Sequence, residues 1–462
     1  MPAWIMNEKH NWFWKGLTGN DMTRQSDKKI PLTVLHTSDW HLGRSLYGRR
    51  RYDEFEAFLS WLAETIRQRQ VDVLLVSGDI FDTTTPSNKA QELYYRFLCE
   101  AAASSCRHVV ITAGNHDSPS FLEAPKTLLK VMNVHVIGSI SDQTDDEVLV
   151  LHDSVGEPEL IVCAVPYLRD RDIRLAEAGE SLEDKERKLV SGIREHYAQV
   201  TALALEKRYN LQASRNQHNE DNQHLLTNEA SASTEDLPII CMGHLFTAGG
   251  KTAEGDGVRE LYVGSLAHVT ADIFSENFAY VALGHLHIAQ KIAGKNHMRY
   301  CGSPLPMGFG EASQQKSVCE IKILSEMTDI CQIQVPVFQK LVQIRGDLTF
   351  ILIKIQTLSQ SREPIWLEII YDGVEVVTDL REKLEAAIEG QAIEILRIKN
   401  NRLAERALEP GCHDEKLDDL TPADVFQRCL DAHQISPKQR PLLMQAYNET
   451  VAALLQEDQL AE

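Results

Sequence analysis

Five apolar segments of this sequence each end in side chains that can bind a metal ion. LTVLH, VDVLLVSGD and HVVITAGNHD lie in the first third of the chain, and LPIICMGH and FAYVALGHLH lie in its second half. The polar residues at or just beyond these ends are Asp39, His41, Asp79, Asp82, Asn115, His116, Asp117, His244, His285 and His287. One such segment often marks only a turn, but five in succession predict a shared site.

The spacing of strands and helices indicates how these ends meet. Between residues 32 and 170, apolar runs alternate with the amphipathic segments 53–70 and 88–103. Continuous apolar strands that alternate with helices predict an α/β layered fold. Open α/β sheets place their sites at the carboxyl ends of strands, where the polar residues fall. In an extended chain residues i and i+2 point to the same side, so Asp39 and His41 are expected to face one ion.

Chemistry and composition narrow the class of protein. Mixed imidazole, carboxylate and amide ligands favour a dinuclear site for manganese, iron or zinc over magnesium. No run of 18 apolar residues occurs, so we expect no membrane span. Nine cysteines without CxxC pairs predict reduced thiols in a cytoplasmic protein. The formal charge of −20 excludes a largely basic surface, but local patches or metal ions still allow nucleic-acid binding.

Composition changes along the chain predict its organisation. Residues 1–30 read as a disordered extension or a segment before the true start, with a docking segment as the alternative. The principal domain is expected over 31–336, with a mobile polar loop at about 210–236. A strand–helix–strand pattern predicts a small α+β domain over 340–410. Helices are expected over 420–462, where an apolar stripe indicates either a core face or a docking segment.

The order of the motifs, D-x-H, GD, GNHD, GH and GHxH, resembles the calcineurin-like metallophosphoesterases. The longer stretches LHTSDWHLGRSLYGRRRYDEF, VSGDIFDTTTPS, VALGHLHIAQ and YCGSPLPMGFGE are similar to the double-strand-break repair nucleases of this superfamily. The resemblance extends from residue 32 to about 435. It implies a sandwich of two mixed sheets flanked by helices, with the smaller domain capping DNA.

The resemblance also implies a role for each strand-end residue. Two divalent cations, manganese first and magnesium, iron or zinc as alternatives, would be held by Asp39, His41 and His287 and by Asn115, His244 and His285, with Asp79 bridging both. His116 would help the leaving group depart, with a hydrogen-bonded structural role as the alternative. Asp82 and Asp117 would orient the ligands.

Partners follow from the same resemblance. It implies DNA ends, hairpins and single strands as substrates, cut by ATP-dependent double-strand exonuclease and single-strand endonuclease activity in repair, replication and recombination. The sequence has no GxxxxGK[ST] motif, so an SMC-type ATPase would supply ATP hydrolysis, with a homodimer inside a heterotetramer. Basic residues after the first motif are either DNA-backbone contacts or a solvated helix start: Arg44, Arg49, Arg50 and Arg51.

Two other functions share parts of this pattern. A metallophosphoesterase acting on phosphoproteins or small phosphate esters would use the same metal core. The phosphoprotein branch carries GNHE and GD-x-x-DRG, whereas this sequence has GNHDS and GDIFD, which favours the nuclease. A non-enzymatic scaffold with structural metals is the third possibility, and the intact ligand set counts against it.

Overall fold

The computed structural model describes residues 31–400, apart from 142, 175–179, 224–236, 252–268, 326, 362, 374, 376 and 378. It also describes isolated residues between 426 and 447 and two short antiparallel strands, β1 (Ile5–Met6) and β2 (Trp12–Phe13), in the unit that ends at Pro31. Otherwise the predicted extension (1–30) and most of the predicted C-terminal helices (420–462) lie outside the described residues.

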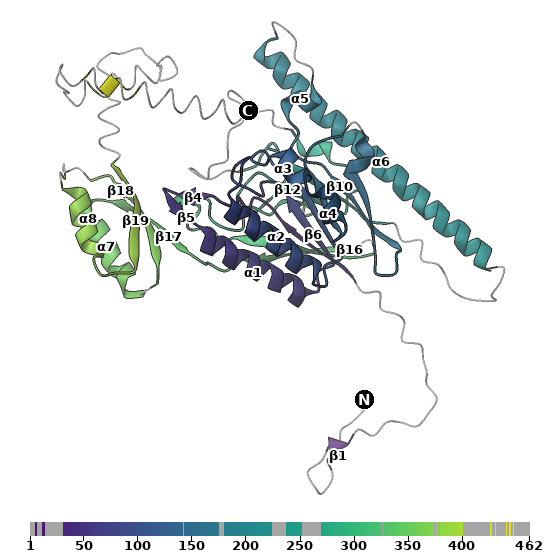
Figure 1. The fold of residues 1–462 in the computed structure, drawn as a ribbon, viewed down its shortest axis with the longest axis horizontal. Coiled ribbons are helices and arrows are strands. Elements are labelled where there is room, and N and C mark those ends of the chain that lie inside the picture. The colour runs from purple at the N-terminus through teal and green to yellow at the C-terminus, as the bar shows by residue number, and fades with distance from the viewer. Residues whose placement is uncertain are drawn as a thin grey trace. The chain divides into compact units, whose positions relative to one another are not determined.

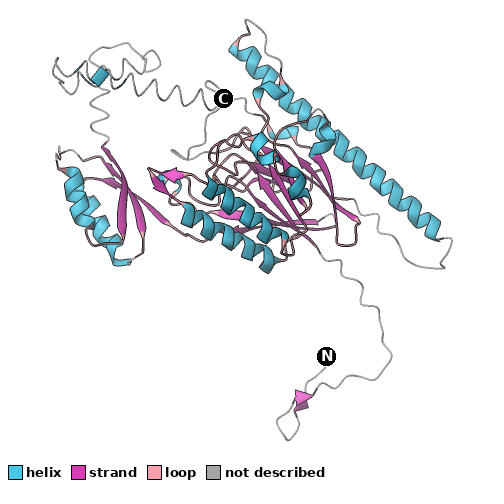
Figure 2. Ribbon diagram, in the orientation of Figure 1, coloured by secondary structure: helices cyan, strands magenta, loops and turns pink. Residues whose placement is uncertain are grey.

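Two six-stranded sheets form the centre of the second unit (Figures 1 and 2). The first has the order β16 (Met327–Gln334), β15 (Ser317–Leu324), β3 (Leu32–Thr37), β6 (Val73–Ser77), β7 (His108–Thr112) and β8 (Val134–Ile137). The second has the order β13 (Gln290–Lys291), β14 (Met298–Tyr300), β12 (Tyr280–Gly284), β11 (Ile239–His244), β10 (Pro158–Ala164) and β9 (Val148–His152). Both sheets mix parallel and antiparallel pairs, so the predicted α/β sandwich is confirmed.

Each sheet is covered on both faces, which explains the continuous apolar runs. In β6, Val73 and Leu75 pack into the core between the two sheets, whereas Leu74 and Val76 pack beneath helices. These helices are α1 (Tyr52–Arg69) and α2 (Asn88–Ala102). The outer face of the second sheet packs against α6 (Leu182–Gln223). Shorter helices are α3 (Pro119–Glu123), α4 (Lys126–Lys130) and α5 (Asp170–Ile173).

Helix α6 corrects one sequence-based expectation. The segment at about 210–236 was expected to be a loop, but the helix continues to Gln223, and residues 224–236 lie outside the described residues. Leu211, Ala213 and Arg215 are good helix formers, although the segment is polar. The Arg215 guanidinium donates to the Pro158 carbonyl at 2.6 Å, which ties this part of α6 to β10.

A smaller three-stranded sheet follows the sandwich. Its parallel strands β17 (Lys340–Gly346), β18 (Ile365–Tyr371) and β19 (Ile393–Asn400) are connected by α7 (Leu348–Leu358) and α8 (Leu380–Ile388). The Asp347 side chain caps α7 by accepting from the Phe350 amide at 2.8 Å. A two-strand hairpin, β4 (Ser45–Leu46) and β5 (Arg49–Arg50), precedes α1. Among the described helices, none combines the length and apolar character that a bilayer span requires.

Candidate metal centre

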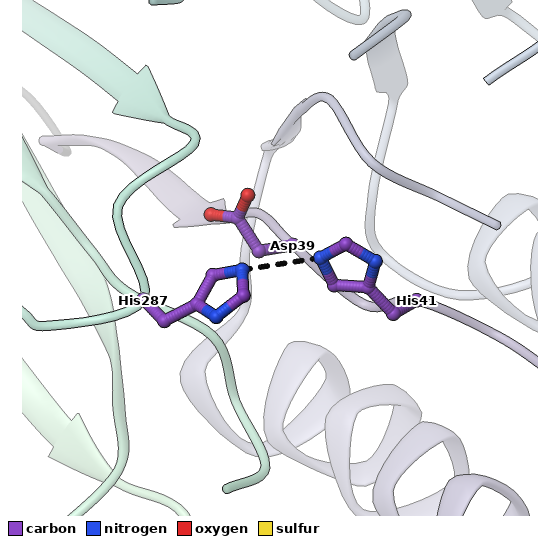
Figure 3. Close-up of side chains that lie close together, drawn as sticks. All are labelled: Asp39, His41 and His287. Atoms are coloured by element: carbon purple, nitrogen blue, oxygen red, sulfur yellow. Dashed lines mark hydrogen bonds between the residues drawn. The ribbon is translucent and has the colours of Figure 1, made fainter. Parts of the chain in front are cut away.

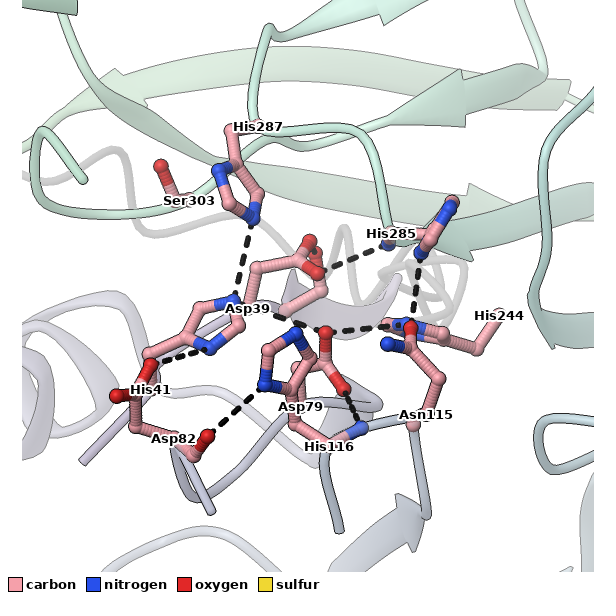
Figure 4. Close-up of polar contacts among 12 residues, drawn as sticks. Asp39, His41, Asp79, Asp82, Asn115, His116, His244, His285, His287 and Ser303 are labelled. Carbon is pink, nitrogen blue, oxygen red and sulfur yellow. Dashed lines mark hydrogen bonds and ion pairs between the residues drawn. The ribbon is translucent and has the colours of Figure 1, made fainter. Parts of the chain in front are cut away.

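The carboxyl ends of the parallel strands bring the predicted ligands together. β3, β6 and β7 run parallel in the first sheet, and β11 and β12 run parallel in the second. Figure 4 shows side chains from both sheets pointing into one cluster. Six of the seven predicted metal ligands are buried: Asp39, His41, Asp79, His244, His285 and His287. Potential ligand atoms in three groups of side chains lie within 4.8 Å of one another: Asp39–His41–His287, Asp79–His244–His285 and His41–Asp82–His116.

The backbone at these strand ends is unusual. Four of the clustered residues have a positive φ although none is glycine: Asp39 (54°), His41 (48°), Asp79 (51°) and His285 (100°). Such conformations cost on the order of 1 kcal/mol or more each and concentrate at functional sites. The expectation that Asp39 and His41 project from an extended chain is therefore wrong. The chain turns sharply after Thr37, and the turn itself aims both side chains into the cluster.

The first group joins the two sheets (Figure 3). His41 Nε2 and His287 Nε2 lie 3.2 Å apart, although one comes from the loop after β3 and the other from the loop after β12. Asp39 Oδ1 accepts a hydrogen bond from the His285 amide at 2.9 Å, and the Ser38 hydroxyl donates to Asp39 Oδ2. Two imidazole nitrogens and a carboxylate that converge in this way are suitable ligands for one transition-metal ion.

Two histidines of the second group, His244 and His285, face the side-chain oxygen of Asn115. His244 Nε2 lies 3.1 Å and His285 Nδ1 lies 3.0 Å from Asn115 Oδ1. His244 Nδ1 donates to the Ser77 carbonyl at 2.9 Å, which directs its Nε2 inward. Gly78, with a φ of +83°, makes this approach possible, because a Cβ there would lie 2.1 Å from His244 Nδ1.

Asp79 lies between His41 on one side and His244 on the other. Its Oδ2 is 3.6 Å from His41 Nε2 and 3.3 Å from His244 Nε2, and its Oδ1 accepts from the His116 amide at 2.9 Å. Burial opposes ionisation of Asp79, but His244 and His41 outweigh burial and hold the pKa of this carboxyl well below its usual value. Burial lowers the pKa of His244, and the charge of Asp79 raises it more strongly, to about 9. Burial lowers the pKa of His285 to about 3.

The predicted residues near the ligands, His116, Asp82 and Asp117, make different contacts. His116 Nδ1 donates to the Asp82 carbonyl at 2.9 Å, and its ring packs edge-on against His41. Asp82 Oδ1 lies 3.3 Å from His41 Nδ1. Asp117 instead accepts from the backbone amides of Ile80, Phe81 and Gly114, so it holds the strand-end loops. Burial and the charge of Asp79 raise the pKa of Asp117 to about 6.

The buried carboxylate that contacts His287 carries no recognisable signal in the sequence. Glu311 is fully buried, and its Oε1 lies 3.3 Å from His287 Nδ1. Burial opposes its charge, but His287 and Lys316 lower the pKa of this carboxyl to about 2. Glu311 is the last residue of the stretch YCGSPLPMGFGE, which supported the family resemblance without a role for its glutamate. No spacing rule connects a residue at position 311 to a histidine at 287.

The arginines after the first motif differ in how far their side chains are exposed. Arg51 is 2% exposed, and its guanidinium makes two bonds to Glu54, of 2.7 and 2.9 Å. Arg51 was expected to be either a DNA-backbone contact or a solvated helix start; the structure instead places its side chain in the interior, where it anchors the start of α1. Arg49 and Arg50 are exposed in β5, and Arg49 pairs with Glu394 at 3.1 Å. Arg44 pairs with Asp82 at 3.2 Å.

The donor set fits a pair of divalent cations. Imidazole nitrogens, carboxylates and one amide oxygen face a common centre, and this mixture suits transition metals. His41 and His287 each have their outer ring nitrogen 3.3 Å from a carboxylate oxygen, the arrangement that directs a ligand's other nitrogen to a metal. The Asn115 amide presents its oxygen to His244 and His285, and its buried Nδ2 has no hydrogen-bond partner among the described residues.

Comparison with known families agrees with this chemistry. The calcineurin-like phosphoesterase family matches residues 32–289. The family described as the type 5 capsule protein repressor C-terminal domain matches residues 337–434. The first match covers more than half of the chain and includes every strand-end motif. With its two-sheet fold and its His/Asp clusters, the chain is a metal-dependent phosphoesterase with a dinuclear metal site.

Similar proteins indicate which metal-dependent phosphoesterases this chain resembles. The chain is 33% identical over 430 residues to the SbcD subunit of nuclease SbcCD from Escherichia coli (strain K12), covering 92% of this chain and 98% of that protein. It is 34% identical over 289 residues to the protein of the same name in Bacillus subtilis (strain 168), covering 62% of this chain and 65% of that one. The chain therefore belongs to the SbcD family of nucleases, which are metal-dependent phosphodiester hydrolases.

Proposed function

We propose that this chain hydrolyses DNA phosphodiester bonds as the nuclease subunit of a complex with an SbcC-like, SMC-type ATPase. The observation that carries the proposal is the convergence of seven potential ligands from two sheets: Asp39, His41, Asp79, Asn115, His244, His285 and His287. The relatives' name describes one subunit of a complex, and this sequence has no GxxxxGK[ST] motif of its own. An ATPase partner would therefore supply ATP hydrolysis.

The proposed ligand sets follow the two groups in the cluster. Asp39, His41 and His287 hold one cation, and Asn115, His244 and His285 hold the other. Asp79 would bridge them, because its Oδ2 lies near His41 of the first set and near His244 of the second. We propose manganese as the native metal, since the imidazole-rich ligand set disfavours magnesium. Bound cations of this kind neutralise the charge of a phosphodiester and activate water near neutral pH.

His116 is proposed to act on the leaving group. Because its Nδ1 donates to the Asp82 carbonyl, its Nε2 is the nitrogen that can give or take a proton. The hydrogen bond fixes the ring beside the cluster without using Nε2. A positioned acid of this kind contributes about 10²–10⁴-fold to the rate. Asp82 is proposed to orient His41, and Asp117 to support the loops that carry Asp79 and Asn115.

The rest of the chain is assigned by the same proposal. The sheet β17–β19 belongs to a region of about 340–410 that would cap DNA, and residues 420–462 would dock the ATPase. Exposed Arg49 and Arg50 and the half-buried Arg44 would hold the DNA backbone. We propose a homodimer within a heterotetramer, located in the cytoplasm on the nucleoid, that acts in repair, replication and recombination.

Co-expression with an SbcC-like ATPase tests the proposal. The purified complex should degrade linear duplex DNA with Mn²⁺ and ATP, and it should also open hairpins and cut single strands. Omission of ATP should stop duplex degradation, because only the partner can couple ATP to DNA. Hydrolysis of p-nitrophenyl phosphate without DNA cleavage under any of these conditions would instead indicate a phosphoesterase for small esters.

A further inference from the structure

A second buried polar cluster lies at the outer nitrogen of His287. We call it the Glu311 clamp and define it as Ser303, Glu311 and Lys316. Ser303 and Glu311 are fully buried, and Lys316 is 6% exposed. Figure 4 shows Ser303 beside the His287 ring nitrogen that points away from His41. None of the three residues belongs to the proposed ligand set.

The clamp holds His287 by both its ring and its backbone. Glu311 Oε1 lies 3.3 Å from His287 Nδ1, and Oε2 accepts from the Met307 amide at 3.0 Å and from Lys316 Nζ. Lys316 Nζ also donates to the His287 carbonyl and to Ser303 Oγ, both at 3.0 Å. The Ser303 amide donates to the same carbonyl at 3.2 Å. Lys316 and Ser303 therefore fix the backbone of His287, and Glu311 faces the outer nitrogen of its ring.

Stability alone is a poor explanation for this arrangement. A buried ion pair loses its hydration, and apolar residues of similar volume often stabilise a fold as well or better. The position of the pair is more informative. A carboxylate at the outer nitrogen of a ligating histidine fixes the tautomer and keeps the other nitrogen directed at the metal.

The clamp is also joined to the smaller sheet. Glu311 ends a short 3-10 helix, Phe309–Glu311, and the Phe309 ring stacks on Tyr47 at a centroid distance of 5.9 Å. Phe309 packs in one apolar cluster with Leu46 of β4 and Leu341 of β17. The Arg397 guanidinium of β19 lies over the Tyr47 ring and donates to its hydroxyl at 2.6 Å. A chain of direct contacts therefore runs from the C-terminal sheet to His287.

We propose that Glu311 is a positioning residue for His287 and that Phe309 makes this positioning depend on the packing of the C-terminal sheet. The carboxylate sets the ring orientation that the metal requires. Displacement of the C-terminal sheet, for example by bound DNA, would move Phe309 and with it Glu311. The inference rests on the proposed function, specifically on His287 as a ligand.

Mn²⁺ binding to the full-length chain tests the first half without an activity assay. Glu311→Gln should weaken one of two Mn²⁺ sites by about 10–100-fold in calorimetric titration, the usual effect of removing such a partner. The same variant loaded with Co²⁺ should show an altered visible spectrum. Glu54→Gln is the matched control, because Glu54 is also buried and ion-paired, to Arg51, but contacts none of the proposed ligands. It should bind both ions with wild-type affinity.

Further variants separate the possible outcomes. Glu311→Asp keeps the charge beside Lys316 and should weaken binding less than Glu311→Gln. Equal losses in the two variants, or wild-type affinity in Glu311→Gln, would overturn the proposal. Phe309→Ala should weaken the same site in the same direction, and unchanged affinity would remove the second half. His287→Ala should lose one Mn²⁺. If it retains two, the assignment of His287 as a ligand fails. If His287→Ala loses one ion but the Glu311 variants bind both ions with wild-type affinity, only this inference fails.

Discussion

Two buried carboxylates, Asp79 in the sandwich and Glu368 in the C-terminal sheet, have nearly the same exposure and opposite surroundings. Asp79 is 2% exposed, and Glu368 is 1% exposed. Glu368 lies 3.5 Å from Arg397 and 3.3 Å from Lys399, and it accepts a hydrogen bond from the Gln343 side chain (Nε2) at 2.6 Å. Its charge is thus balanced by permanent cations of the same sheet. The side chains that face Asp79 are imidazoles, which are neutral or charged according to pH and ligand.

The difference shows how a site is distinguished from a structural ion pair. Around Glu368 the chain supplies both charges, so Arg397 and Lys399 neutralise the carboxylate without an external cation. Around Asp79 the chain supplies lone pairs on several histidines, and strained strand ends aim them at the carboxylate. A buried carboxylate surrounded by imidazoles is suited to share an external cation. Matched variants in the two kinds of surroundings should therefore respond differently.

Replacing the two carboxylates by their amides should give the largest difference. Asp79→Asn should reduce Mn²⁺-dependent DNA hydrolysis to the level seen with EDTA, because the proposed bridge between the cations is lost. Glu368→Gln should keep hydrolysis far above the level seen with EDTA and instead lower the free energy of unfolding by about 1–3 kcal/mol, since polar partners lose their charged acceptor. Nuclease assays measure the hydrolysis, and urea unfolding measures the free energy of unfolding. Equal loss of hydrolysis in the two variants would remove the contrast.

Two buried histidines, one at the start of β7 and one in the loop that follows it, provide the next test. His116→Ala should lower kcat by about 10²–10⁴-fold while two Mn²⁺ still bind, because the proposed role is proton transfer and not ligation. His108 is 9% exposed and contacts the His152 carbonyl at the far end of the strand. His108→Ala should retain wild-type kcat. A loss of bound Mn²⁺ in His116→Ala would show that this histidine is a ligand.

The pH dependence of metal binding separates the imidazole site from a permanent ion pair. The pKa of His244 is raised to about 9, so below pH 9 a proton competes with a metal for its ring. Mn²⁺ affinity should therefore rise with pH between 6 and 8 by up to about tenfold per unit, with release of one proton. Calorimetry in two buffers of different ionisation enthalpy measures the proton. Affinity that is independent of pH would contradict the role assigned to His244.

The adjacent arginines of the hairpin and α1 give the smallest expected effect. Arg50→Ala should weaken DNA binding and reduce the slope of log affinity against log salt by about 1, as expected for one phosphate contact. Arg51→Ala should leave the slope unchanged and lower thermal stability, because Arg51 is paired with Glu54 in the interior. Binding isotherms at several salt concentrations decide between them. A reduced slope in Arg51→Ala alone would reverse the assignment.

Local patterns in the sequence predicted the α/β layered fold and the strand ends that carry the site, whereas the two-sheet sandwich followed from the family resemblance. Apolar runs such as VDVLLVSGD indicate strands that are buried on both faces, and the polar residue that closes each run marks the carboxyl end of the strand. The left-handed backbone of Asp39 and His41 could not be predicted in this way, because it depends on contacts between loops. The Asp39 amide, for example, donates to the Gly78 carbonyl at 3.0 Å.

Three features escaped prediction for distinct physical reasons. Glu311 approaches His287 only in the folded chain, and no sequence periodicity connects the two residues. Arg51 sits in a basic run that reads as surface, but Glu54 one helical turn later draws it inside. Helix α7 was not recognised, because Ile351, Ile353 and Ile355 alternate as they would in a strand. The capping Asp347 was the available signal for its start.

Anomalous diffraction at the manganese edge, from crystals grown with Mn²⁺, tests the central claim most directly. We predict two peaks about 3.5–4 Å apart, the separation of two-metal hydrolytic sites. One should be coordinated by Asp39, His41 and His287, and the other by Asn115, His244 and His285, with Asp79 bound to both. A single peak, or peaks coordinated by other residues, would contradict the account.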